Sequence, residues 1–254
     1  MGKYYALRTL LCMIGWFVNW DEIWRCYRNG SPLPALRFRR GFTLNHRPGD
    51  QILLQFYETL RDKSYRRFIT EPQQGTLLDI GANVGVVTVD WANRLPSVHI
   101  HAYEPHSLNF ATLHENVKSN GFSSRVSLYQ EAVGRSIGPA NLRASGLSME
   151  TSAYSTAAAS EEFSVPMVSL GAVIQRCKGH IGLAKIDAEG AEVDILEGAD
   201  AQTLSEIRQL VIEYHDGLVP SARERCQQVL YGAGFRCATR PLMPGQGLLY
   251  AWRD

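Results

Sequence analysis

The sequence predicts an α/β protein with a doubly wound, mostly parallel sheet of seven strands. Apolar runs of strand length alternate with helix-like segments between Leu77 and His215, a pattern typical of a parallel sheet covered by helices. A turn of small residues, 81–85, joins the first of these runs directly to a helical pattern. Near the end of the chain, residues 235–240 and 248–252 predict an antiparallel C-terminal hairpin that completes the sheet.

Length, charge and cysteine content fit a compact enzyme. The 254 residues, 45% of them hydrophobic, suffice for one such domain at 71–254 and a helical and hairpin extension at 1–70. The formal net charge of +1 gives no overall field that attracts nucleic acid, so we expect no nucleic-acid partner. The five cysteines are odd in number and have no zinc-site spacing, which indicates a reducing compartment and a cytoplasmic protein.

The N-terminal extension predicts one amphipathic helix and a small hairpin at 36–44. The uncharged run at 9–20 is shorter than the roughly 20 residues that cross a bilayer, and no signal-peptide cleavage site follows it. We expect one helical face to pack on the domain, and its members are Leu7, Leu10, Leu11, Ile14, Phe17 and Val18. The alternative is peripheral membrane contact anchored by Trp16, Trp20 and Trp24.

The turn after the first strand of the domain predicts a cofactor site. Gly81 can adopt a positive φ and leaves space for a ligand, and Gly85 falls where the next helix must pack close to the strand. Unpaired N–H groups at the start of that helix suit an anionic ligand group. The spacing has Asn83 in place of the middle glycine of a dinucleotide motif, and it lacks the lysine of a P-loop.

The pattern Asp-x-Gly-x-Asn-x-Gly at 79–85 resembles motif I of the class I S-adenosylmethionine-dependent methyltransferases. The resemblance implies a Rossmann-like fold in which this loop holds the methionine part of S-adenosylmethionine. The residues to which it assigns this role are Asp79, Gly81, Ala82, Asn83 and Gly85.

The next two strands predict the rest of the cofactor site. The strand at 98–103 ends in Glu104 and Pro105, 25 residues after Asp79, and an acid at this position can accept hydrogen bonds from both ribose hydroxyls. The alternative is that Glu104 only caps the helix that follows at 107–118. A third strand, at 125–129, precedes Glu131 and Ala132, which the resemblance places beside the adenine.

Charged residues gather at the ends of the last two parallel strands. Lys185, Asp187 and Glu189 project to one side if the strand stays extended, so they must pair or face a cleft. The strand at 209–215 ends in Glu213 and His215, which share a face. With its unperturbed pKa near neutrality, His215 is a candidate general base. The structural alternative is an ion pair of Lys185 with a glutamate and a helix N-terminal cap by Asp187 or Glu189.

Four segments in this order and spacing resemble the FkbM family of methyltransferases over residues 75–215. They are Asp-Ile-Gly-Ala-Asn at 79–83, Tyr-Glu-Pro at 103–105, Ala-Val-Gly at 132–134 and Lys-Ile-Asp-Ala-Glu-Gly-Ala-Glu at 185–192. The resemblance implies an S-adenosylmethionine-dependent O-methyltransferase that acts on a saccharide or small-molecule hydroxyl. On the acceptor side we expect Lys185, Asp187, Glu189, Glu213 and His215. Stacking surfaces for a sugar could come from Trp16, Trp20, Trp24 and Tyr27.

Two other functions fit the same residues. Asp187, Glu189, Glu213 and His215 offer oxygen and nitrogen donors that suit Mg²⁺ or Mn²⁺, so the transfer could be assisted by a divalent metal. Alternatively, the charged residues form only a salt-bridge network in a non-catalytic protein that binds the cofactor. A polar stretch at 140–164 contains the tract Ala157-Ala158-Ala159-Ser160, which we expect to act as a lid.

Overall fold

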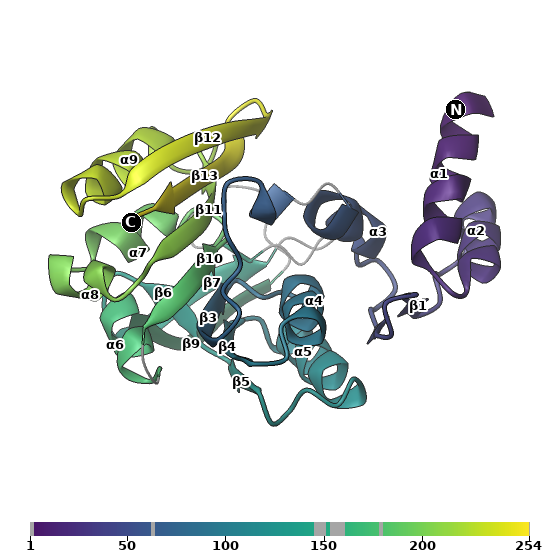
Figure 1. Ribbon diagram of the computed structural model, residues 1–254, viewed down its shortest axis with the longest axis horizontal. Helices are drawn as coiled ribbons and strands as arrows, with labels where there is room; N and C mark the ends of the chain where they lie inside the picture. Colours follow the sequence, from purple (N-terminus) through teal and green to yellow (C-terminus); the bar gives the residue numbers. More distant parts are fainter. Residues whose placement is uncertain (1–2, 62–63, 145–150, 153–160, 178–179, 254) are drawn as a thin grey trace.

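A seven-stranded sheet forms the centre of the protein (Figure 1). The computed structural model describes residues 3–61, 64–144, 151–152, 161–177 and 180–253. The expected lid at 157–160 lies outside these residues. In order across the sheet, the strands are β12 (Arg236–Met243), β13 (Gln246–Trp252), β11 (Gln209–His215), β10 (Ile181–Ile186), β3 (Gly75–Ile80), β4 (Val98–Tyr103) and β5 (Val126–Tyr129).

The predicted sheet is confirmed. The strands from β11 to β5 are parallel, whereas β13 runs antiparallel to both β11 and β12. Consecutive side chains of β3 point to opposite faces, so Leu77 belongs to one hydrophobic core and Leu78 to another. A strand buried on both faces is typical of a parallel sheet with helices on each side.

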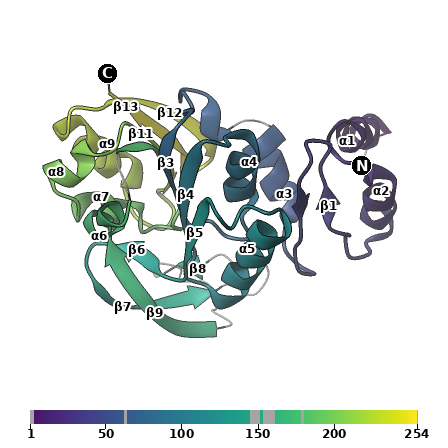
Figure 2. The ribbon, with the colours of Figure 1, turned by 60° about the horizontal axis from the view of Figure 1, so that its bottom comes forward.

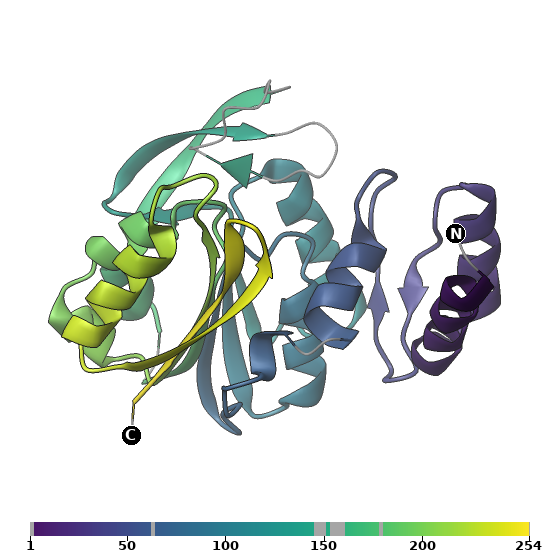
Figure 3. The same cartoon turned by 90° about the horizontal axis from the view of Figure 1, so that it is seen from above.

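Helices cover both faces of the sheet (Figure 3). The core that contains Leu77 is completed by α4 (Val86–Arg94) and α5 (Ser107–Ser119). The core that contains Leu78 is completed on the other face by four helices, which are α6 (Leu170–Gln175), α7 (Glu192–Glu197), α8 (Ala201–Ser205) and α9 (Ala222–Gly232). The sheet is therefore doubly wound, as predicted.

A second, four-stranded sheet lies beside the first (Figure 2). Its order is β6 (Ala132–Gly134), β9 (Glu161–Ser169), β7 (Gly138–Ala144) and β8 (Thr151–Ser152). We did not predict strands in the polar stretch from 140 onward. Polar side chains dominate there because only one face of this small sheet is apolar, where Leu142 and Val165 are buried.

The N-terminal extension contains two helices instead of the single one expected. They are α1 (Lys3–Trp16) and α2 (Trp20–Asn29), and between them Val18 donates a backbone hydrogen bond to Arg37. The predicted hairpin is present as β1 (Leu36–Arg37) paired with β2 (Thr43–Leu44). It leads to α3 (Ile52–Phe56), a π-helical turn (Tyr57–Arg61) and a 3₁₀ turn (Ser64–Arg66).

The predicted apolar face around α1 is buried only in part, and it packs against Phe38 and Phe56 of the extension. Phe17, which was predicted, and Met13, which was not, are fully buried, whereas Leu7, Leu11 and Val18 are exposed. Trp16, Trp20 and Trp24 are partly buried against the same core that contains Leu77. Within the described residues, no helix has the length and apolar character required to cross a bilayer.

Candidate functional site

The candidate site lies where β3 and β10 end side by side. The chain adds β4 and β5 toward one edge of the sheet, and β10 and β11 lie toward the other, so the strand order reverses between β3 and β10. In doubly wound sheets the ligand cleft opens at the carboxyl ends of the strands at such a point. Two cavities open here, and both are lined by Gly81, Asn83, Asp187 and Glu189.

Gly81 allows the two strand ends to approach each other. Its φ is +75°, and a Cβ at this position would overlap the carbonyl oxygen of Asp187 and lie 2.8 Å from its carbonyl carbon. The backbone N–H groups of Gly81 and Ala82 both donate to Tyr103, at 3.0 and 2.9 Å. The free space expected at Gly81 is therefore occupied by the backbone of Asp187, although Gly81 still lines both cavities.

Gly85 serves a different contact from the one predicted. A Cβ there would lie 2.6 Å from Cδ1 of Leu113 on α5, so the glycine lets the start of α4 approach another helix and not the strand.

Asp79, the first residue of the 79–85 motif, is fully buried beneath the loop. It accepts a hydrogen bond of 2.6 Å from the Thr88 hydroxyl and lines neither cavity.

Glu104 lies at the tip of β4 and shapes the loop. Its carboxylate accepts hydrogen bonds of 2.9 Å from the backbone N–H groups of Asn83 and His106, and a longer one of 3.5 Å from the Asn109 amide. The bond to Asn83 fixes a residue with φ of +51°, a conformation that asparagine tolerates. Burial raises the pKa of Glu104 to about 7, although the two backbone hydrogen bonds oppose the shift.

The first cavity extends from the β3–α4 loop toward the second sheet. Six of the nine residues predicted to bind the cofactor line it, which are Gly81, Asn83, Glu104, Pro105, Glu131 and Ala132. Its far wall comes from the second sheet, through Ala140, Leu142 and Met167. We did not predict that wall because we did not predict the second sheet. Glu131 is held at the edge of the cavity by a hydrogen-bonded ion pair with Arg176.

The second cavity lies between the sheet and the N-terminal extension. Its outer wall is formed by residues around α3 and the π-helical turn, which are Gln51, Leu54, Gln55, Glu58 and Thr59. Its inner wall includes Ala82, predicted for the cofactor, and four side chains of the predicted acceptor side, which are Lys185, Asp187, Glu189 and Glu213. The aromatic residues expected to stack on a sugar, Trp16, Trp20, Trp24 and Tyr27, do not line this cavity.

Lys185 is enclosed by oxygen atoms beneath the loop. Its ammonium lies 3.2 Å from Asp79 and 3.5 Å from Asp187, and it donates a hydrogen bond of 2.8 Å to the carbonyl of Gly81. Burial lowers the pKa of Lys185, but the charges of Asp79 and Asp187 outweigh this and raise the pKa above its usual value. Lys185 is therefore a charged group that fixes the loop, and its ion pairs are with aspartates instead of the glutamate of the structural alternative.

Tyr65 is a site residue that the sequence did not indicate. Its hydroxyl lies 2.8 Å from Glu213 and 3.3 Å from Asp187, and so links the ends of β10 and β11. Gln246, also unpredicted, donates a hydrogen bond of 2.6 Å to Glu213. Burial and the neighbouring charge of Asp187 raise the pKa of Glu213 to about 7. These two partners fix the Glu213 carboxylate at the wall of the second cavity.

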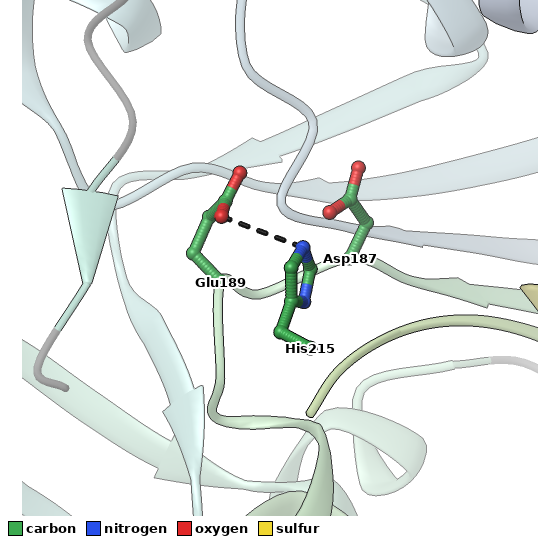
Figure 4. A group of neighbouring side chains, drawn as sticks. All are labelled: Asp187, Glu189 and His215. Carbon is green, nitrogen blue, oxygen red and sulfur yellow. Dashed lines mark ion pairs between the residues drawn. The ribbon is translucent and has the colours of Figure 1, made fainter. Parts of the chain in front are cut away.

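His215 lies beside the carboxylates of Asp187 and Glu189 (Figure 4). Its Nδ1–H donates to Glu192 at 3.1 Å, and its Nε2 lies 3.5 Å from Glu189. Burial lowers the pKa of His215, but the hydrogen bond and charge of Glu192, with the charges of Glu189 and Asp187, raise it to about 10. The unperturbed pKa near neutrality on which the general-base assignment rested therefore does not describe this imidazole, and the assignment itself stays a prediction.

A family model and one similar protein of known name point to the same family. A family model described as the methyltransferase FkbM domain matches residues 79–237, which is more than half of the chain. The chain is 28% identical to the 31-O-demethyl-FK506 methyltransferase FkbM of Streptomyces tacrolimicus over 83% of this chain and 93% of that protein. It is 26% identical to the AMB antimetabolite synthetase AmbE of Pseudomonas aeruginosa, where 73% of this chain matches 11% of a much longer protein.

A solved structure shows the same fold. The crystal structure of the methyltransferase FkbM from Methylobacillus flagellatus superposes on the chain with a TM-score of 0.56 and 13% sequence identity. The superposition covers 98% of this chain and 59% of the other, so this chain spans little more than half the length of that protein.

Proposed function

This chain belongs to the FkbM family of methyltransferases, and we propose that it uses S-adenosylmethionine to methylate a hydroxyl of a saccharide or small molecule. The observation that carries the proposal is the shared wall of two cavities at the ends of β3 and β10. A methyl donor in one cavity and an acceptor in the other would meet at Asp187 and Glu189.

The first cavity fits S-adenosylmethionine, which is the usual cofactor of this fold. Glu104 accepts three hydrogen bonds from the protein, and a carboxylate offers about four acceptor positions, so one position remains for a ribose hydroxyl. The apolar side chains of Leu142 and Met167 suit the adenine ring at the far wall. Asn83 and Gly81 lie at the end that adjoins the second cavity, where the sulfonium methyl group has to be.

The second cavity suits an acceptor that carries several hydroxyl groups. Gln51, Gln55, Glu58, Thr59 and Gln246 offer both hydrogen-bond donors and acceptors along its walls. The name of the Streptomyces relative refers to a 31-O-demethyl compound, which supports oxygen as the acceptor atom here.

The chemistry requires positioning and one proton acceptor. The acceptor oxygen forms a bond to the methyl carbon while the carbon–sulfur bond breaks, and the electron pair of that bond stays on sulfur to give S-adenosylhomocysteine. The hydroxyl proton passes to a base. We assign this role to Glu213, because its carboxylate lines the second cavity and is fixed there by Tyr65 and Gln246.

Calorimetry tests the donor site. S-adenosylmethionine and S-adenosylhomocysteine should bind to the full chain, and NAD should not. Glu104→Ala should weaken binding by about 1–3 kcal/mol, the scale of lost charge-assisted hydrogen bonds. Glu115→Ala, which removes an exposed acid of α5, is the matched control and should bind normally. Equal affinity for NAD would overturn the cofactor assignment, and unchanged binding by Glu104→Ala would place this residue outside the ribose site.

Turnover tests the acceptor site. Using labelled methyl donor and a panel of glycans and small hydroxylated molecules, Glu213→Gln should lower kcat by about 10²–10⁴-fold and leave donor affinity unchanged. Glu58→Gln changes another carboxylate of the same cavity and should raise KM with little effect on kcat. Tight donor binding without turnover on any acceptor would favour a non-catalytic binding protein.

A further inference from the structure

Asp187 and Glu189, which line both cavities, form a compact set of metal-ligand donors together with His215 (Figure 4). We propose that these three residues bind one divalent metal ion. The role given to the ion below rests on the proposed function, because it assumes that the second cavity takes the acceptor. Whether the ion binds does not depend on that assumption.

The donor atoms are already close to the spacing that an ion requires. One possible ligand atom from each residue lies within 4.8 Å of the other two. Ligands on opposite sides of a small divalent ion stand about 4–4.6 Å apart, since each bond is about 2.0–2.3 Å long. The residues come from the neighbouring ends of β10 and β11, which are paired strands, so only small side-chain adjustments are needed.

An independent feature is the buried carboxylate that orients the histidine. Glu192 is fully buried at the start of α7, and it accepts the Nδ1–H of His215 at 3.1 Å. It also accepts backbone N–H groups of Ala188 and Gly190, at 2.9 and 3.0 Å, which fixes its own position. This leaves Nε2 directed at Glu189 and Asp187, and an ion that binds there takes the place of the Nε2 proton, which is released to solvent. Metal-binding histidines almost always have such a carboxylate or carbonyl partner on the second ring nitrogen.

The charge balance of the cluster favours a cation. Two side chains that can carry positive charge, Lys185 and His215, form ion pairs with four of five neighbouring carboxylates. Lys185 is already engaged by Asp79, Asp187 and the carbonyl of Gly81. A divalent ion would offset the remaining negative charge. The five carboxylates belong to Asp79, Asp187, Glu189, Glu192 and Glu213.

The donor set also defines the class of ion and what it would do. One imidazole with two carboxylates suits a divalent ion of the Mn²⁺ type better than a soft metal, which would favour thiolates. Three protein ligands leave coordination positions open, as in catalytic metal sites. Asp187 and Glu189 line the second cavity, so an open position can take the acceptor oxygen and hold it toward the donor.

Manganese binding by the full chain tests the proposal directly. Protein freed of metal with a chelator is titrated with MnCl₂, and free Mn²⁺ is measured by electron paramagnetic resonance. We expect one ion per chain, with spin-echo coupling to an imidazole nitrogen. Glu189→Gln and Glu192→Gln should each weaken binding about 10–100-fold, and His215→Gln should abolish the nitrogen coupling. Asp194→Asn, which removes a nearby acid that lines the first cavity, should bind Mn²⁺ normally.

Several results would overturn the metal site. They are a lack of stoichiometric binding, an absence of nitrogen coupling in the unmodified protein, or equal weakening by Asp194→Asn and Glu189→Gln. In each case His215, with its raised pKa, would serve as the cation of the cluster. Circular dichroism identifies variants that fail to fold. If a variant does not fold, the presence or absence of nitrogen coupling in the unmodified protein decides whether His215 binds the ion. Donor binding and turnover in chelator would show that the proposed function survives without the metal. Manganese binding without donor binding would refute the proposed function alone.

Discussion

Replacing Gly81 with alanine tests the close approach of β3 and β10 at the site. The residue has φ of +75°, and a Cβ there would overlap the carbonyl oxygen of Asp187 and lie 2.8 Å from its carbonyl carbon. The left-handed conformation costs a residue with a Cβ about 1–2 kcal/mol. Overlap with packed backbone adds about 1–3 kcal/mol, because neither strand end can move freely. We therefore expect Gly81→Ala to lower the free energy of unfolding by about 2–5 kcal/mol.

Gly121→Ala is the matched control. Gly121 has nearly the same φ, +76°, but a Cβ there would meet nothing within 4 Å, so only the conformational cost of about 1–2 kcal/mol applies. Urea unfolding of both variants measures the difference, and calorimetry with S-adenosylmethionine should show lost affinity for Gly81→Ala alone. Equal losses of stability in the two variants would refute the reasoning, because the contact with Asp187 would then contribute nothing.

Three further predictions concern charged groups of the site. S-adenosylmethionine should bind more weakly as the pH falls through about 7, because Glu104 then gains a proton and loses the charge that a ribose hydroxyl would contact. Calorimetry at several pH values should find no such pH dependence in Glu104→Gln, and a pH dependence that persists in this variant would contradict the assignment. Lys185→Met should lower the free energy of unfolding in urea by about 3–5 kcal/mol, since it leaves the fully buried Asp79 unpaired, and adding Asp79→Asn should restore part of the loss. Tyr65→Phe should lower kcat without changing donor affinity, because Glu213 loses a hydrogen bond of 2.8 Å. An unchanged kcat in steady-state kinetics would count against a role of Tyr65 in fixing the Glu213 carboxylate.

The sequence predicted the parts of the fold that depend on local pattern. The parallel strands, the C-terminal hairpin and the β1–β2 hairpin each follow from apolar runs separated by turns. The second sheet did not, because its strands are apolar on one face only and are separated by a long polar stretch. For α1, helical periodicity was visible, but periodicity alone did not show that Met13 would be buried and Leu7 and Leu11 exposed.

In the candidate site, too, residues marked by a local pattern were predicted and residues brought together only by the fold were not. Glu104, Asp187 and Glu189 follow strand ends, where chain order predicts a cleft. Tyr65 was missed because it lies 122 residues from Asp187 along the chain, and no local pattern marks such a contact. The shift in the pKa of His215 could not be predicted, because it depends on Glu192, which precedes His215 by 23 residues and is buried only in the folded protein.

If the two cavities hold donor and acceptor as proposed, their common wall makes the binding of each ligand depend thermodynamically on the other. A molecule that orders Asp187 and Glu189 from one side changes what a second molecule must reorder from the other. Linkage requires this effect to be reciprocal, so any factor by which the donor tightens acceptor binding is also the factor by which the acceptor tightens donor binding. The demethylated product presents no methyl group at this wall, so the factor should differ between the two forms of the donor. Cooperative capture of substrates and sequential release of products would then have the same structural origin.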